Sequence, residues 1–127
     1  MMDDKYMSDK ANFEKLRVYQ QTLNLVDMIY KITKEFPKEE VYGLVAQLRR
    51  AIVSIALNIA EGQGRMSNAE NKNFLLIARA SIYEAMAILE IAFRQNYVSQ
   101  EQRELVRKNL FSILRQLNSL IKYLRSK

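Results

Sequence analysis

An uncharged run of ten residues, from Ala51 to Ala60, constrains the fold of this chain more than any other feature. The surrounding segment, residues 47–65, reads QLRRAIVSIALNIAEGQGR. A helix with apolar side chains on every side must be buried in a core, a membrane or a subunit interface. The run is too short for a bilayer, which needs about 20 apolar residues. We therefore expect it at the centre of a helix bundle, also touching a second subunit.

The rarity of turn-forming residues predicts long structural elements. The chain has 127 residues, of which 3 are glycine and 1 is proline, and 49% of the residues are hydrophobic. A chain of this length is expected to form one domain with a real core. Helices are the only long elements that so few breaks allow, so the composition predicts an all-α protein.

Hydrophobic spacing and helix-end signals predict four helices, at about residues 13–35, 40–61, 68–95 and 99–125, after a polar and flexible segment of residues 1–12. Pro37 ends the first helix, and Gly62 or Gly64 ends the second in a left-handed conformation. Ser67 or Asn68 is expected to cap the third helix, where Ser67 and Glu70 fit a capping box, and Ser99 is expected to cap the fourth. The short connections predict an up-down-up-down, left-handed four-helix bundle.

Each helix is expected to turn one apolar line toward the core. The expected core line of the first helix follows alternating steps of three and four residues. It consists of Leu16, Tyr19, Leu23, Val26, Tyr30 and Thr33. The expected core line of the second helix consists of Val41, Val45, Leu48, Ile52, Ile55 and Ile59.

The second and third helices carry more apolar positions than one core face requires. We expect the surplus positions to form a homo-oligomer interface, since unpartnered apolar faces favour closed symmetric assemblies. This predicted interface consists of Ile77, Ser81, Ile88, Ile91, Val53 and Leu57.

A polar line on the second helix predicts a buried network. Buried polar groups need partners, and such a network would fix the register of the helices. Its predicted members are Arg50, Ser54, Asn58, Glu61 and Glu84. For Arg50 we favour an ion pair within or between subunits over a phosphate or RNA contact.

The chain contains no cysteine and no histidine. These absences remove thiol nucleophiles, histidine bases and Cys/His metal sites. Nothing in the sequence supplies a nucleophile or a metal beside Glu61 and Glu84. The pair Gly62 and Gly64 follows a helix, whereas phosphate-binding loops follow a strand. We therefore predict no catalytic residues, no metal, no cofactor and no enzymatic activity.

The basic balance of the chain points to nucleic acid as a partner. The formal net charge is +6, and residues 103–127 carry seven Lys or Arg against one acid. Within this segment Lys108, Arg115 and Lys122 recur every seven residues. They would project from one face at intervals of about 10 Å and could follow a phosphate backbone. The alternative interpretation is a solvated outer face.

The start of the chain lacks the apolar region of about 7–15 residues that a signal peptide requires. We therefore expect a cytoplasmic protein without a membrane partner.

Several motifs together resemble one protein family. They include FPKEE at 36–40, YGL at 42–44, QLRRA at 47–51, NIAEG at 58–62 and IAR at 77–79, followed by Ser81 and Glu84. In this pattern the chain resembles the 23S ribosomal RNA intervening-sequence proteins, which are small bacterial four-helix bundles. The resemblance covers about residues 13–124. Ala56, Tyr19 and Ala80 stand where the family often has Pro, Trp and Gly, and all three are packing positions.

The resemblance also implies an assembly and a partner. The accessory protein of diversity-generating retroelements is similar, and it forms a homopentameric barrel that binds nucleic acid through a basic surface. By this likeness we expect a homopentamer, with Arg49, Arg65 and Arg79 as further nucleic-acid contacts. We expect a non-enzymatic, oligomeric protein that binds nucleic acid, RNA in preference. The alternative is a protein-interaction scaffold that binds no nucleic acid.

Overall fold

The computed structural model describes residues 11–126, so most of the flexible segment predicted at 1–12 lies outside the described residues. Within residues 11–126 the chain forms α2 (Arg17–Thr33), α3 (Leu44–Gln63), α4 (Asn68–Arg94) and α5 (Gln100–Arg125). Two short 3-10 helices, η1 (Asn12–Lys15) and η2 (Lys38–Glu40), precede α2 and α3. No helix in this range is long and apolar enough to cross a membrane.

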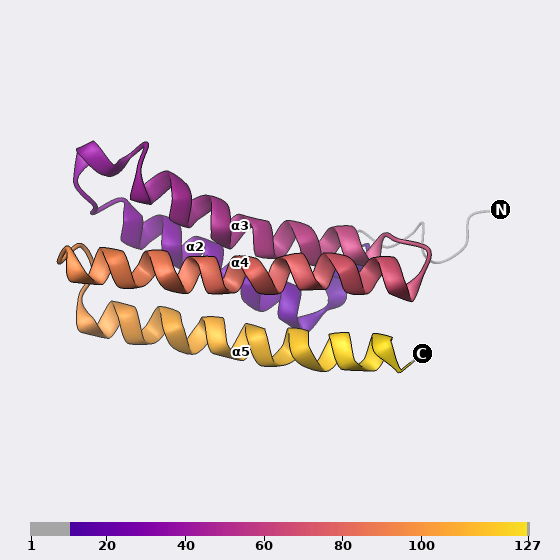
Figure 1. The fold of residues 1–127 in the computed structure, drawn as a ribbon. Helices are drawn as coiled ribbons and strands as arrows, with labels where there is room; N and C mark the ends of the chain where they lie inside the picture. Colours follow the sequence, from indigo (N-terminus) through magenta and orange to yellow (C-terminus); the bar gives the residue numbers. More distant parts are fainter. Residues whose placement is uncertain (1–10, 127) are drawn as a thin grey trace.

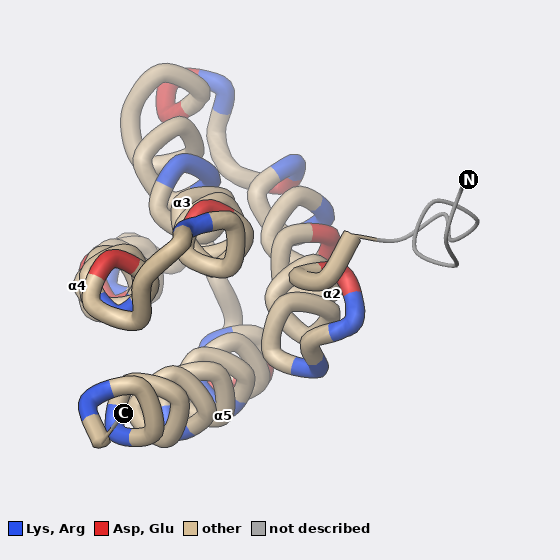
Figure 2. The backbone as a smooth tube through the Cα atoms, turned by 90° about the vertical axis from the view of Figure 1, so that its right-hand side faces the viewer, with Lys and Arg blue, Asp and Glu red and all other residues tan. Residues whose placement is uncertain are grey.

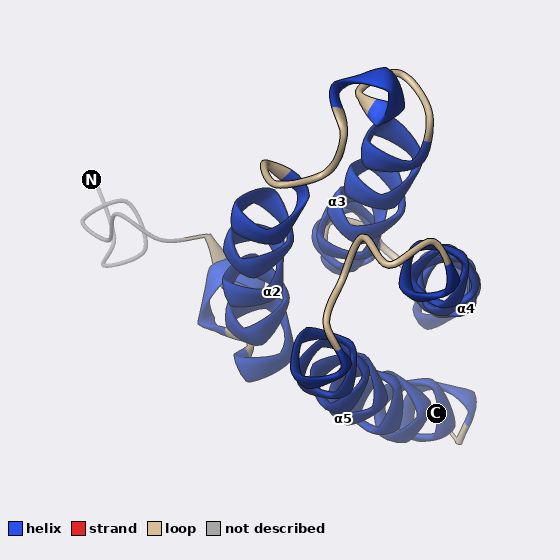
Figure 3. Ribbon diagram, turned by 90° about the vertical axis from the view of Figure 1, so that its left-hand side faces the viewer, coloured by secondary structure: helices blue, strands red, loops and turns tan. Residues whose placement is uncertain are grey.

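The four α-helices pack as the predicted up-down-up-down bundle. Consecutive helices run antiparallel, and α4 lies between α3 and α5 (Figure 1). Viewed along the helix axes, α2 closes the bundle by packing on both α3 and α5 (Figure 3). The all-α, single-domain prediction is confirmed.

Branched aliphatic side chains fill the space between the helices. The largest fully buried side chains are Leu25, Ile29, Leu48, Ile52, Ile55, Ile59, Leu75, Ile82, Leu89, Leu110, Ile113 and Leu117. One side of the uncharged run therefore lies in the core, whereas Leu57 on its other side is exposed. The predicted core line of α3 holds except at Val41, which is 47% exposed because it lies in the turn before the helix.

The core face of α2 differs from the predicted line. Leu23 and Tyr30 are exposed, whereas the buried positions are Val18, Thr22, Leu25, Ile29, Ile32 and Thr33. Two threonines can enter the core because their hydroxyls bond within the helix. Thr22 Oγ1 donates to the Val18 carbonyl at 2.7 Å, and Thr33 Oγ1 donates to the Ile29 carbonyl at 2.7 Å. Thr33 was part of the predicted line, whereas Thr22 was not, because apolar spacing alone does not select a threonine whose hydroxyl is satisfied within the helix.

The helix ends follow local hydrogen bonds. Ser67 Oγ accepts from the Glu70 amide at 3.1 Å, and Ser99 forms a full capping box with Gln102, so both predicted caps are confirmed. The first helix begins later than predicted because residues 12–15 form η1, after which Leu16 is extended.

The boundaries predicted for the second helix are also displaced. Glu40 belongs to η2, and its Oε1 accepts from the Leu44 amide at 3.1 Å, so α3 begins after that carboxylate. The Glu40 Oε2 atom accepts from the Tyr97 hydroxyl at 3.2 Å. Partial burial and this carboxylate raise the pKa of Tyr97.

The prediction of a left-handed glycine at the end of α3 is wrong. Gly62 lies inside the helix, and Gly64 follows the helix with a φ of −83°. A Cβ at Gly62 would lie 3.1 Å from the Asn71 carbonyl oxygen, so this glycine permits close packing of α3 on α4. Among the described residues the left-handed position is instead Asn96, with a φ of 65°, just after α4.

Candidate nucleic-acid surface

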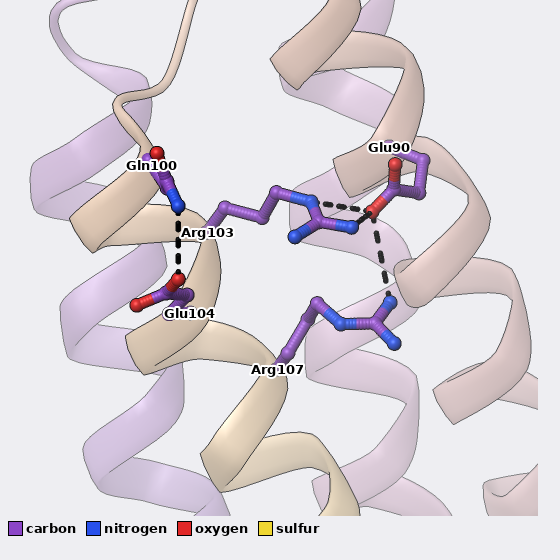
Figure 4. Close-up of polar contacts among 5 residues, drawn as sticks. All are labelled: Glu90, Gln100, Arg103, Glu104 and Arg107. Atoms are coloured by element: carbon purple, nitrogen blue, oxygen red, sulfur yellow. Dashed lines mark hydrogen bonds and ion pairs between the residues drawn. The ribbon is translucent and has the colours of Figure 1, made fainter.

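Five of the six basic residues of α5, all except Arg125, fall into two groups, and the first group is paired with an acid inside the chain. Arg103 Nε donates to Glu90 Oε1 at 2.5 Å, and Arg107 Nη1 lies 3.7 Å from the same oxygen (Figure 4). Near them, Gln100 Nε2 donates to Glu104 Oε1 at 3.2 Å. Arg103 and Arg107 therefore join α5 to α4 and share the single negative charge of Glu90.

The second group consists of Lys108, Arg115 and Lys122, which are all exposed. None of the three has an ion pair or hydrogen bond within residues 11–126. A helical rise of 1.5 Å per residue places them about 10 Å apart. No acidic residue follows Glu104 in the sequence. The charged positions in the C-terminal half of α5 are therefore all Lys or Arg, drawn in blue in Figure 2. The structure thus presents a basic row with uncompensated charge.

A further basic residue from α2 lies beside this row. Arg17, Arg115, Ser112, Gln116 and Ser119 line one hollow between the start of α2 and α5. Arg17 is exposed and has no ion-pair partner among the described residues. Sequence reasoning missed Arg17 because only the packing of α2 on α5 brings it close to a residue so distant in the chain. No motif or spacing in the sequence indicates that Arg17 and Arg115 line the same hollow.

The three arginines suggested by the family resemblance all have partners in the same chain. Arg49 Nε donates to Thr33 Oγ1 at 2.9 Å, and the guanidinium carbon lies 4.2 Å from the centre of the Tyr30 ring. The guanidinium carbon of Arg65 also lies over an aromatic ring, 4.6 Å from the centre of Phe74. Arg65 pairs with Glu61 at 2.7 Å, and Arg79 donates to Asn118 Oδ1 at 3.1 Å. These guanidinium groups are less available to a ligand than the row on α5.

The predicted polar network is smaller in the structure. Ser54 Oγ lies 2.9 Å from Ser81 Oγ, and Asn58 Nδ2 donates to the Ser54 carbonyl at 2.8 Å. Its other predicted members, Arg50, Glu61 and Glu84, are exposed in the single chain. Their positions on α3 and α4 point outward from the core. Ser81, expected at the subunit interface, takes part in this network instead.

The outer side of α3 and α4 carries an apolar face, which we call the α3–α4 face. Leu57 is 61% exposed, Ile77 50% and Ile91 48%. Val53 is half-buried beside them. Ser81 and Ile88 are buried in the core of the single chain, so they do not belong to this outer face as predicted.

Comparison with known proteins places this arrangement in a family. A sequence model described as 23S rRNA-intervening sequence protein matches residues 14–119. The chain belongs to the 23S rRNA-intervening sequence protein family. A search of curated proteins found no match. Family membership accounts for the bundle and carries no assigned catalytic activity.

A solved structure of a protein with unknown function from the S23 ribosomal protein family of Bacteroides thetaiotaomicron is similar to this chain. The two share 29% sequence identity with a TM-score of 0.77. The match covers 83% of this chain and 95% of the other. The fold described above is therefore shared with an experimental structure over almost the whole length of that protein.

Proposed function

We propose that this 23S rRNA-intervening sequence protein is a non-enzymatic, homo-oligomeric protein that binds nucleic acid and prefers RNA. The row of Lys108, Arg115 and Lys122 on α5 is the observation that carries the proposal. Three free positive charges at about 10 Å intervals on a rigid helix suit contacts to successive parts of a phosphate backbone. The preference for RNA rests on the family resemblance.

Self-assembly through the α3–α4 face supports this function. The Ser54–Ser81 hydrogen bond sets the antiparallel register of α3 and α4, which places Leu57 level with Ile77. The same register places Arg50 level with Glu84, and both are exposed without an ion pair inside the described chain. Exposed apolar residues with opposite charges between them suit a second copy of the same chain.

Assembly would also strengthen the binding of a long ligand. Each subunit adds a formal charge of +6 and its own α5 row. Linked rows raise the effective concentration of each site for the same strand. A ring requires a head-to-tail contact, in which the α3 side of one α3–α4 face meets the α4 side of the next subunit, and it closes when the rotation between subunits allows it. The family resemblance favours a ring of five.

The first test is to purify the protein at low salt and measure its mass by size-exclusion chromatography with light scattering, with absorbance at 260 and 280 nm. We expect an assembly near five times the 14.9 kDa of one chain, carrying RNA that ribonuclease removes. RNA should dissociate as salt increases, since phosphate contacts are salt-dependent. An oligomer that retains no RNA at low salt would favour the alternative, a protein-interaction scaffold.

The assembly surface is tested by the double substitution Leu57→Glu and Ile91→Glu. Both side chains are about half exposed or more in the single chain, so the bundle should remain folded while the charges oppose association. We expect a monomer by light scattering with an unchanged helical circular dichroism spectrum. Leu105→Glu is the control, because Leu105 is also 48% exposed but lies on α5. If the double variant keeps its assembled mass, another surface joins the subunits.

A further inference from the structure

We propose that two adjoining hollows between the start of α2 and the C-terminal half of α5 bind one nucleotide unit of a single-stranded nucleic acid. The phosphate would lie between Arg17 and Arg115, and the base beside Leu16 and Leu120. This inference rests on the proposed function. It adds that the nucleic acid is single-stranded and that one of its nucleotides binds in these hollows.

The first hollow is polar and basic. Its volume is about 230 Å³, and its lining consists of Arg17, Ser112, Arg115, Gln116 and Ser119. The donors of Gln116 and Ser112 are already used, since both side chains donate to Gln21 Oε1, at 2.6 and 3.3 Å. The two guanidinium groups are free within the described chain. Paired guanidinium groups are strong, directional ligands for a phosphate.

The second hollow is apolar and continues from the first. Its volume is about 290 Å³, and Leu16, Val18 and Leu120 form its apolar lining. Three residues, Arg17, Gln116 and Ser119, line both hollows, so a ligand can occupy them together. Each hollow is somewhat smaller than the pockets of about 300–1,000 Å³ that hold a drug-sized ligand. Each therefore suits one part of a ligand, here an anionic group joined to a flat apolar group.

The surroundings of the hollows favour a strand over a free amphiphile. Lys108 and Lys122 lie seven residues on either side of Arg115, so phosphates before and after the bound nucleotide would also meet positive charge. A base that enters an apolar slot must leave the stack of its neighbours. A duplex must both unpair and unstack the base before it can enter the slot, whereas a single strand only has to unstack it. The site should therefore bind single strands more tightly than duplexes.

Fluorescence anisotropy with the full chain at about 0.1 M salt tests the site, using a labelled single-stranded RNA of about 12 nucleotides and the duplex of the same sequence. We expect tighter binding of the single strand. Leu120→Gln should weaken single-strand binding about 5- to 30-fold, because it removes apolar surface that the base would cover, and leave duplex binding unchanged. Leu124→Gln is the matched control, because Leu124 is also a partly buried α5 leucine but lies outside the hollows. Thermal unfolding verifies that both variants fold.

A second pair of variants tests the phosphate position. Arg17→Gln and Lys122→Gln each remove one positive charge, and only Arg17 lines the hollows. We expect Arg17→Gln to reduce single-strand affinity more than Lys122→Gln, with no such difference for the duplex.

The outcomes separate this inference from the proposed function. Equal affinities for single strand and duplex, or equal effects of Leu120→Gln and Leu124→Gln, would overturn the nucleotide site while RNA binding by the basic row stands. Adenosine monophosphate that competes as well as the strand itself would overturn the assignment to a strand. Failure of the unsubstituted protein to bind either RNA would overturn both proposals.

Discussion

Replacing Ile52 by alanine should lower the free energy of unfolding by about 2–5 kcal/mol, the usual cost of deleting a large aliphatic side chain from a core. Ile52 is 0% exposed and lies in the middle of the uncharged run of α3. That helix packs on both α2 and α4, so a cavity at Ile52 removes contacts on more than one side. Urea unfolding followed by circular dichroism measures the change.

Leu105→Ala is the control for this substitution. Leu105 is 48% exposed, so its truncation should alter the free energy of unfolding by only about 0.5 kcal/mol. Both variants are compared at one protein concentration, because self-association would add a concentration-dependent term to the stability. A loss below about 1 kcal/mol for Ile52→Ala would contradict the central position of this residue in the core.

The fold was predictable where the signals are local and unambiguous. An uncharged ten-residue run predicts a helix in the core, which its buried side confirms, and serine caps mark the starts of α4 and α5. The core face of α2 was not predictable from apolar spacing alone. Its buried side includes Thr22 and Thr33, whose hydroxyls are satisfied by the helix backbone. The predicted core line of α2 and the observed one then fit helical spacing about equally well. Only the packing of α2 on α3 and α5 selects between the two lines.

The candidate site was predictable in part for a similar reason. The row of Lys108, Arg115 and Lys122 depends only on helical spacing, and the structure places all three on the surface. The neighbouring position of Arg17 depends on how α2 packs against α5, which no motif records. Arg50 and Glu84 were expected in a buried network because both interrupt apolar lines. Their outward rotation follows from the crossing of α3 and α4, which the sequence does not specify.

Reversing the charge of the α5 row, by Lys108→Glu, Arg115→Glu and Lys122→Glu together, should weaken the binding of single-stranded RNA at least about 100-fold near 0.1 M salt. Each phosphate contact contributes about 0.7 to the slope of log affinity against log salt for single strands. Three lost contacts therefore reduce the slope by about 2, which corresponds to two decades of affinity between 0.1 and 1 M salt. Anisotropy titrations at several salt concentrations measure both quantities.

A matched set of substitutions distinguishes the effect of where the charges lie from the effect of how many there are on RNA binding. Lys31, Lys34 and Lys38 are exposed, lie in or just after the last turn of α2 and in η2, and do not line the hollows beside Arg115. Their replacement by glutamate changes the net charge by the same amount as reversal of the α5 row. Because nonspecific attraction depends on total charge whereas a contact depends on position, the control should retain most of the salt slope. If both sets reduce the affinity and the slope equally, the α5 row is not the contact surface and only the overall positive charge attracts RNA.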